Sequence, residues 1–168
     1  MAQVRTYSQL LRELERARNR ALMGASKKAE QLVKDKIDSD VYGTYSSEGY
    51  SRTYQLRESV EASNVEVVGN KAVVFIEHNE SKITSSGNQH RSVVDGYSSA
   101  SVIANIVHNG FTGAIGQSGY WKSAPWSKPE HTYANARPYM DNAKMEMQNG
   151  KYRKFMIEQL RGQGYTVR

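Results

Sequence analysis

The side chains best suited to chemistry in this sequence are its four histidines, His78, His90, His108 and His131. None lies four residues from another, and no HExxH or comparable metal-binding spacing surrounds them. The chain has no cysteine, which excludes disulfides, thiol nucleophiles and zinc–thiolate sites. We therefore predict that the histidines lie on the surface or in loops, and that the protein binds no metal and no cofactor.

The serines, glycines and carboxylates also lack the spacing of a catalytic motif. No G-x-S-x-G element is present. Residues 113–119 are rich in glycine, but they lack the Gly-Lys-Ser/Thr ending and the preceding strand of a phosphate-binding loop. Carboxylate pairs such as Asp38 with Asp40 have charged neighbours, not the apolar pocket that tunes acid–base catalysis. The sequence predicts that the protein is not an enzyme, and a hydrolase with a scattered site stays as an alternative.

Aromatic residues gather in the segment 111–135, and two of them stand beside or near a lysine. These residues are Phe111, Tyr120, Trp121, Trp126 and Tyr133. They can stack bases while lysines meet phosphates, anchor another protein, or pack as the core of a loop. We favour the anchor, because Trp and Tyr dominate interface hot spots, and predict a subunit or neighbour interface here.

The spacing of apolar residues predicts a helix over about 7–38, with Thr6 and Gln9 forming a capping box at its start. One buried stripe is expected along it, made of Leu10, Leu11, Leu14, Ala17, Ala21, Leu22, Ala25, Ala29, Leu32, Val33 and Ile37. A helix of about 30 residues is ~45 Å long. Such a helix is longer than a compact domain of this size needs, so we expect part of it to meet a partner.

Alternation of apolar residues predicts a β-hairpin of residues 62–68 and 71–78 around the turn pair Gly69-Asn70. A short helix is expected within 98–107. A C-terminal helix should start at Arg137-Pro138 and kink near Asn149-Gly150. We predict one α+β domain, residues 1–168, with a long N-terminal helix and a C-terminal helix packed on a small antiparallel β-sheet. Residues 1–6 and 162–168 are expected to be flexible termini, and 79–97 and 111–135 long loops.

The net charge of +6 is divided unevenly along the chain. The first 40 residues and the last 33 are basic, and the segment between them is nearly neutral. A basic balance fits a nucleic-acid partner, a solvated helix surface or an acidic protein partner. The excess is spread along the helices, so we favour the last two and keep nucleic-acid binding by the basic helices as the alternative. No apolar run is long enough to span a membrane and no signal peptide is visible, which predicts a soluble protein.

Three short segments carry a family resemblance: residues 56–60 (LRESV), 106–110 (IVHNG) and 137–143 (RPYMDNA). Their order, after a long helix and around a hairpin, resembles the neck and tail-completion proteins of tailed bacteriophages, also called head–tail joining or minor tail components. The family often has a glutamate where His108 stands. The resemblance marks as structural the motif residues Leu56, Arg57, Ser59, His108, Gly110, Arg137, Pro138, Tyr139, Met140 and Ala143.

The resemblance implies a structural virion protein of the head–tail junction, acting as a tail-completion, connector or tail-terminator protein. It implies a homo-oligomeric ring, a hexamer, that joins the head connector, adaptor or stopper protein to the tail tube or terminator protein. Genomic DNA would pass through the ring without sequence recognition, and no membrane is involved. The expected location is the neck or tail of the virion, after assembly in the host cytoplasm. Because DNA must slide past the channel wall, we expect the nearly neutral, polar loop 79–97 to face the lumen or an axial neighbour, with a solvated surface loop as the alternative. The basic helices are expected to face outward or toward acidic partner surfaces.

Overall fold

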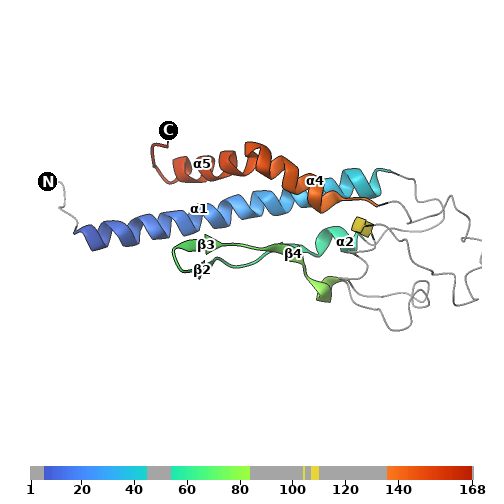
Figure 1. The fold of residues 1–168 in the computed structure, drawn as a ribbon, viewed down its shortest axis with the longest axis horizontal. Helices are drawn as coiled ribbons and strands as arrows, with labels where there is room; N and C mark the ends of the chain where they lie inside the picture. Colours follow the sequence, from blue (N-terminus) through green and yellow to red (C-terminus); the bar gives the residue numbers. More distant parts are fainter. Residues whose placement is uncertain (1–5, 45–53, 84–103, 105–106, 110–135, 168) are drawn as a thin grey trace, which may run out of the picture.

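The computed structural model describes residues 6–44, 54–83, 104, 107–109 and 136–167. One long helix, α1, runs through these residues, with the C-terminal helices on one side and a β-hairpin on the other (Figure 1). The predicted α+β fold is confirmed. The elements are α1 (Tyr7–Lys36), a π-helical turn (Ile37–Tyr42), α2 (Gln55–Glu58), β1 (Val60–Ala62), β2 (Glu66–Val68), β3 (Lys71–Val73), β4 (Ile76–His78), a 3-10 turn (Glu80–Lys82), α4 (Tyr139–Glu146), a second π-helical turn (Met147–Lys151) and α5 (Tyr152–Gly162).

The first helix begins at Thr6, where the predicted capping box is confirmed. The backbone N–H of Gln9 donates to the Thr6 hydroxyl oxygen at 3.4 Å, and the Thr6 N–H donates to the Gln9 side chain at 3.0 Å. These bonds satisfy two backbone donors that have no partner inside the helix. At its other end the helix continues through π-helical turns to Tyr42, four residues beyond the predicted end.

Alanines let the C-terminal helix lie close against α1. Ala17, Ala21, Ala25 and Ala29 are almost completely buried, and α5 packs along this part of the helix. Small side chains shorten the distance between two helix axes, so the backbones approach closely. At the edge of the contact, the Lys28 ammonium lies 2.5 Å from the Glu158 carboxylate.

The predicted buried stripe is wrong for its first three leucines. Leu10, Leu11 and Leu14 are 45%, 42% and 46% exposed, whereas burial begins at Ala17. The leucines are exposed because α5 is too short to cover them: it ends at Gly162, and the next residue, Gln163, lies beside Ala17. The Gln163 side-chain amide donates to the Ala17 carbonyl at 3.3 Å. Residues 7–16 of α1 therefore extend past the end of α5 (Figure 1).

The hairpin forms where the sequence predicts it, with Gly69 at φ 59° in the turn. Its two pairs of strands differ in register by one residue: Ala62 pairs with Ile76, but Glu66 pairs with Val73. The extra residue on the first strand is a β-bulge. At its edge the Ser63 N–H donates to the Phe75 carbonyl at 2.8 Å, and the Phe75 N–H donates to the Ser63 hydroxyl oxygen at 3.0 Å.

The strands of the hairpin are buried most deeply at its base. Val60 is fully buried, whereas Val67 and Val68 near the turn are 60% and 64% exposed. The core lies instead beneath β1 and β4, where they meet α1 and α4. It contains Leu32, Val33, Ile37, Val41, Leu56, Val60, Ile83, Ala104, Tyr139 and Ala143.

The C-terminal helices follow the predicted course, with a kink at the predicted place. Gly150 has a φ of 93° between α4 and α5, and Asn149 has a non-helical ψ of 23°. Pro138 precedes α4 and does not lie within its first turn. The residues after α5 fold back on it, since the Tyr165 N–H donates to the Leu160 carbonyl at 3.1 Å.

Replacing Ala21 by Leu should lower the free energy of unfolding by about 1–3 kcal/mol, because the larger side chain does not fit between α1 and α5. Lys27→Leu is the matched control on the exposed face of the same helix, with an expected change within ~0.5 kcal/mol. Urea unfolding measures both. An Ala21→Leu protein as stable as the original would show that α5 does not pack on this stripe.

Candidate functional site

The three motif segments contribute residues to the core around one buried side chain, Tyr139, the first residue of α4. It is 1% exposed and is the largest fully buried side chain among the described residues. Two histidine rings meet it edge to face, His78 of β4 with a centroid distance of 5.8 Å and His108 at 5.3 Å. Tyr139 therefore joins the hairpin, the segment around His108 and the C-terminal helix.

A chain of hydrogen bonds ties the Tyr139 hydroxyl to the start of the hairpin. The Ser59 hydroxyl donates to the Leu56 carbonyl at 2.7 Å, and its oxygen lies 2.7 Å from His78 Nδ1. The carbonyl can only accept, so the serine proton is used there and His78 Nδ1 must donate to Ser59. His78 Nε2 then accepts from the Tyr139 hydroxyl at 2.8 Å, a much shorter contact than the 3.5 Å from that hydroxyl to the Ala104 carbonyl. This assignment gives each of these buried groups a partner with a neutral histidine.

This geometry does not activate the serine. A serine beside a histidine is the usual nucleophile and base of acyl transfer, provided that the histidine accepts the serine proton. Here His78 donates to Ser59, and Ser59 is fully buried. Burial raises the pKa of Tyr139 above its usual range, which keeps its hydroxyl protonated as a donor. The arrangement holds elements together.

The histidines are placed differently from the prediction of surface or loop positions. His78 lies in β4, where burial, and then the neighbouring His108, lower its pKa below the usual value. The side chain of His108 is mostly buried, and its Nε2 lies 3.2 Å from the Asp141 carboxylate. Within the described residues, His108 Nδ1 is a buried atom without a hydrogen-bond partner. His90 and His131 lie outside the described residues.

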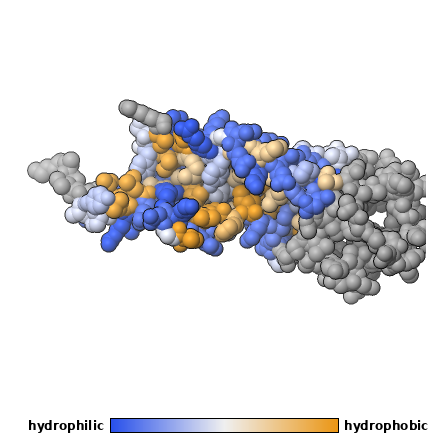
Figure 2. All heavy atoms as spheres, viewed as in Figure 1, coloured by the Kyte–Doolittle hydropathy of each residue, from blue (hydrophilic) through white to orange (hydrophobic). Residues whose placement is uncertain are grey.

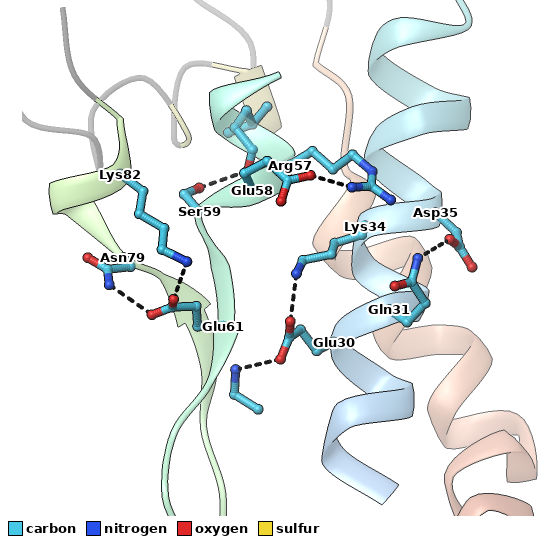
Figure 3. Close-up of polar contacts among 12 residues, drawn as sticks. Glu30, Gln31, Lys34, Asp35, Arg57, Glu58, Ser59, Glu61, Asn79 and Lys82 are labelled. Carbon is cyan, nitrogen blue, oxygen red and sulfur yellow. Dashed lines mark hydrogen bonds and ion pairs between the residues drawn. The ribbon is translucent and has the colours of Figure 1, made fainter. Parts of the chain in front are cut away.

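A hydrogen bond between Glu30 and the strand backbone holds the hairpin against α1, and ion pairs within each element flank it (Figure 3). The Glu30 carboxylate receives the Lys34 ammonium at 2.6 Å and the backbone N–H of Ala62 at 3.2 Å. On the hairpin, Glu61 is paired with Lys82, whose hydrogen bond, together with one from Asn79, lowers the pKa of that carboxyl. A helix side chain thus bonds directly to the strand backbone of β1.

The two motif arginines make contacts on either side of Tyr139, Arg57 through its side chain and Arg137 through its backbone. Arg57 of α2 donates to the Asp38 carboxylate at 2.8 Å and also pairs with Glu58, so it holds α2 against the π-helical turn that follows α1. The Arg137 N–H donates to the Val107 carbonyl at 3.0 Å, which places the chain before α4 beside the residues around His108. Together the two contacts hold the ends of α1 and α4 near Tyr139.

Three of the remaining motif residues, Leu56, Met140 and Ala143, take part in the same packing. Leu56 and Ala143 are buried in the core, and Met140 packs against it half-buried, whereas Pro138 is exposed. A further contact was not predicted: the Asn142 amide donates to the Asp40 carboxylate at 2.8 Å, joining α4 to the end of α1. Three predicted features lie outside the described residues: Gly110, most of the 79–97 loop, and the aromatic set Phe111, Tyr120, Trp121, Trp126 and Tyr133.

No ligand-binding chemistry stands out in the part of the chain that the structure describes. No group of three or more His, Asp or Glu side chains there is placed to hold a metal ion. An open depression of about 500 Å³ is lined by Asp38, Tyr42, Gly43, Tyr54, Arg57 and Glu58. Its one cation, Arg57, is already paired with the two carboxylates beside it. In the described ranges of the chain, no helix has the length and apolar character to cross a membrane.

Removing the Tyr139 hydroxyl should destabilise the fold, because it leaves His78 Nε2 buried without its donor. We expect Tyr139→Phe to lower the free energy of unfolding by about 1–3 kcal/mol. Tyr7→Phe removes the same group from an exposed ring and should change it by less than ~0.5 kcal/mol. Equal stability of the two variants in urea unfolding would count against a buried hydrogen bond at Tyr139.

The lowered pKa of His78 predicts a loss of stability in mild acid. In the unfolded chain the His78 imidazole binds a proton near pH 6.5, whereas in the folded chain it does so only at lower pH. The contribution of neutral His78 to stability is therefore fully present above pH 6.5. That contribution is lost as the pH falls from 6.5 through the lower folded pKa. Paired carboxyls such as Glu146 titrate below this window, since Lys151 and Lys36 bring its pKa to about 2.

The measurement is urea unfolding between pH 7.5 and 5 for the original protein and for His78→Gln. The variant should be less stable at pH 7.5 but lose less stability on acidification. Parallel pH profiles for the two proteins would assign the acid sensitivity to other groups.

Comparison with known proteins identifies the family of this chain. Residues 6–162, from the cap of α1 to the end of α5, match the YomN family. No curated protein and no solved structure gives a significant match. The family is phage-derived, of the Bacillus prophage type. The chain therefore belongs to the YomN family and is a phage-related protein.

Proposed function

We propose that this chain is a structural virion protein of the phage head–tail junction, which forms an oligomeric ring between the head connector and the tail tube. The membership in a phage-derived family supports a role in a phage. The motif segments that resemble neck and tail-completion proteins supply the packing around Tyr139, which holds the described elements together. Within the ring, neighbouring copies would contact each other through different faces.

The observation that carries this proposal is a pair of uncovered apolar elements toward one end of the molecule. They consist of Tyr7, Leu10, Leu11 and Leu14 on α1 and of Val67 and Val68 on the hairpin, all between 42% and 77% exposed. Figure 2 shows apolar side chains at this end as well as along the middle of the described part of the molecule. Contiguous exposed apolar residues usually mark a surface that binds another protein. A protein built to assemble explains this end better than a protein that works alone.

The charges on the C-terminal helices suit an acidic protein neighbour. Arg153, Lys154 and Arg161 line an open face of α5 and are all exposed. Glu158, on the same face, is paired with Lys28 from α1, which leaves an excess of positive charge. In the proposed ring this face points away from the DNA channel. The aromatic set in 111–135 stays a predicted interface with neighbouring proteins.

The same basic face keeps nucleic-acid binding as a second candidate. Phosphate contacts by Arg153, Lys154 and Arg161 would give DNA affinity that falls steeply with salt. Fluorescence anisotropy with duplex DNA at 50 and 200 mM salt separates the candidates. A protein of the neck should bind duplex DNA weakly at both concentrations.

Deleting the gene from an inducible phage should stop head–tail joining. Electron microscopy of the lysate should show DNA-filled heads and separate tails, and the infectious titre should fall at least ~100-fold. A complementing copy with an affinity tag should restore the titre and carry the label to the neck. Joined, infectious particles without the protein would contradict the proposed function.

A further inference from the structure

Two unsupported apolar elements lie at the same end of the molecule (Figure 1). The first is the projecting helix end, which we define as Tyr7, Leu10, Leu11 and Leu14 of α1. The second is the hairpin tip, Val67 and Val68 of β2. All six side chains remain at least 42% exposed, so neither element covers the other within one chain.

The projecting helix end is a formed helix with little support of its own. Its capping box is complete at Thr6, yet α5 reaches only as far as Ala17. About ten residues therefore continue beyond the helix pair. Isolated helices shorter than ~12–15 residues are marginal in water, and most helices in proteins are stabilised by packing an apolar face. The exposed leucines supply such a face.

The hairpin tip has the same deficiency. Successive strand residues point to opposite faces, so Val67 and Val68 leave both faces of β2 apolar and exposed. A two-stranded ribbon is marginally stable without something packed on it. The bulge after Ala62 separates this tip from the supported pair β1–β4, whose backbone is held by Glu30.

The chain already contains the type of contact that would cover both elements. Along its middle, α1 packs against the hairpin strand β1, and Glu30 bonds to the strand backbone at Ala62. The projecting helix end continues that helix, and the hairpin tip continues that ribbon. Exposed charges of both signs flank the apolar side chains, with Arg12, Glu15 and Arg16 on the helix and Glu66 and Lys71 on the hairpin. A second copy supplies the missing partner of each element.

We propose that the projecting helix end of one copy packs against the hairpin tip of a second copy. The two surfaces differ, so the contact is head-to-tail and leaves an unused helix end and hairpin tip on the pair for further copies. Repetition of such a contact closes a ring when the rotation allows it. The inference deepens the proposed function by naming the contact between ring subunits, and rests on that function only for its place in the particle.

Disulfide trapping tests the contact directly, because the chain has no cysteine of its own. A tagged Leu14→Cys chain and an untagged Val67→Cys chain are co-expressed, purified together and oxidised with diamide. We expect a mixed covalent dimer to hold most of the protein on a non-reducing gel. Lys27→Cys with Val67→Cys is the matched control, since Lys27 is exposed on α1 but lies outside the projecting end, and should give at least ~10-fold less mixed dimer.

Three results would overturn the inference: a mixed dimer no stronger than the control, a homodimer of Leu14→Cys alone that exceeds the mixed dimer, or a purified protein that is monomeric in native mass spectrometry. The replaced residues are exposed, and an unchanged unfolding midpoint verifies that each variant is folded. A mixed dimer from a protein absent from virions would leave the contact standing and reject the neck role. A protein found in the neck without the mixed dimer would do the reverse.

Discussion

The structure depends on the burial of one phenol. Tyr139 is 1% exposed, and a hydroxyl at that depth must be paired or cost free energy comparable to a lost hydrogen bond. His78 supplies the partner, and Ser59 in turn fixes the histidine, so the start of the hairpin and the start of α4 must meet at this point. Because His78 of β4 bonds to Ser59 on one side and to Tyr139 on the other, these two hydrogen bonds fix the position of β4 against α4. Val33, Ile37 and Val60 enclose the junction with apolar contacts.

From this junction the molecule extends in one direction along α1. Alanines hold α5 close to α1 as far as Ala17, and Glu30 holds the base of the hairpin. Beyond these contacts the helix and the hairpin continue with leucines and valines that nothing in the described chain covers. The protein thus has a supported body at the Tyr139 end and an apolar extension at the other. This arrangement suits a subunit whose exposed apolar residues are covered by its neighbours.

Local chemistry was enough to predict much of this architecture. Thr6 and Gln9 are three residues apart, so the capping box follows from the sequence, and Gly69-Asn70 predicts the hairpin turn for a similar local reason. The exposed leucines could not be predicted, because the periodic pattern of α1 does not reveal where α5 stops beside Ala17. The bulge is also a tertiary feature, since it appears only when both strands are aligned.

The site shows the same limit. The segment around Tyr139 could be singled out by its resemblance, but its partner His78 stands in no motif and is separated from Tyr139 by 61 positions. A lone histidine at the end of an alternating strand carries no signal that its ring will be buried. The direction of the Ser59 hydrogen bond, which decides against an activated serine, depends on the Leu56 carbonyl and so on the folded α2.

Hydrogen–deuterium exchange tests the central claim most directly, which is that a supported body presents an apolar extension for assembly. Exchange is followed by mass spectrometry in the dilute monomer and in the assembled protein. We predict that the amides of residues 7–16 exchange rapidly in the monomer and become protected on assembly. The amides of residues 32–41 and 139–146 should be protected in both states. Equal exchange of residues 7–16 in the two states, or rapid exchange around Tyr139 in the monomer, would contradict the account.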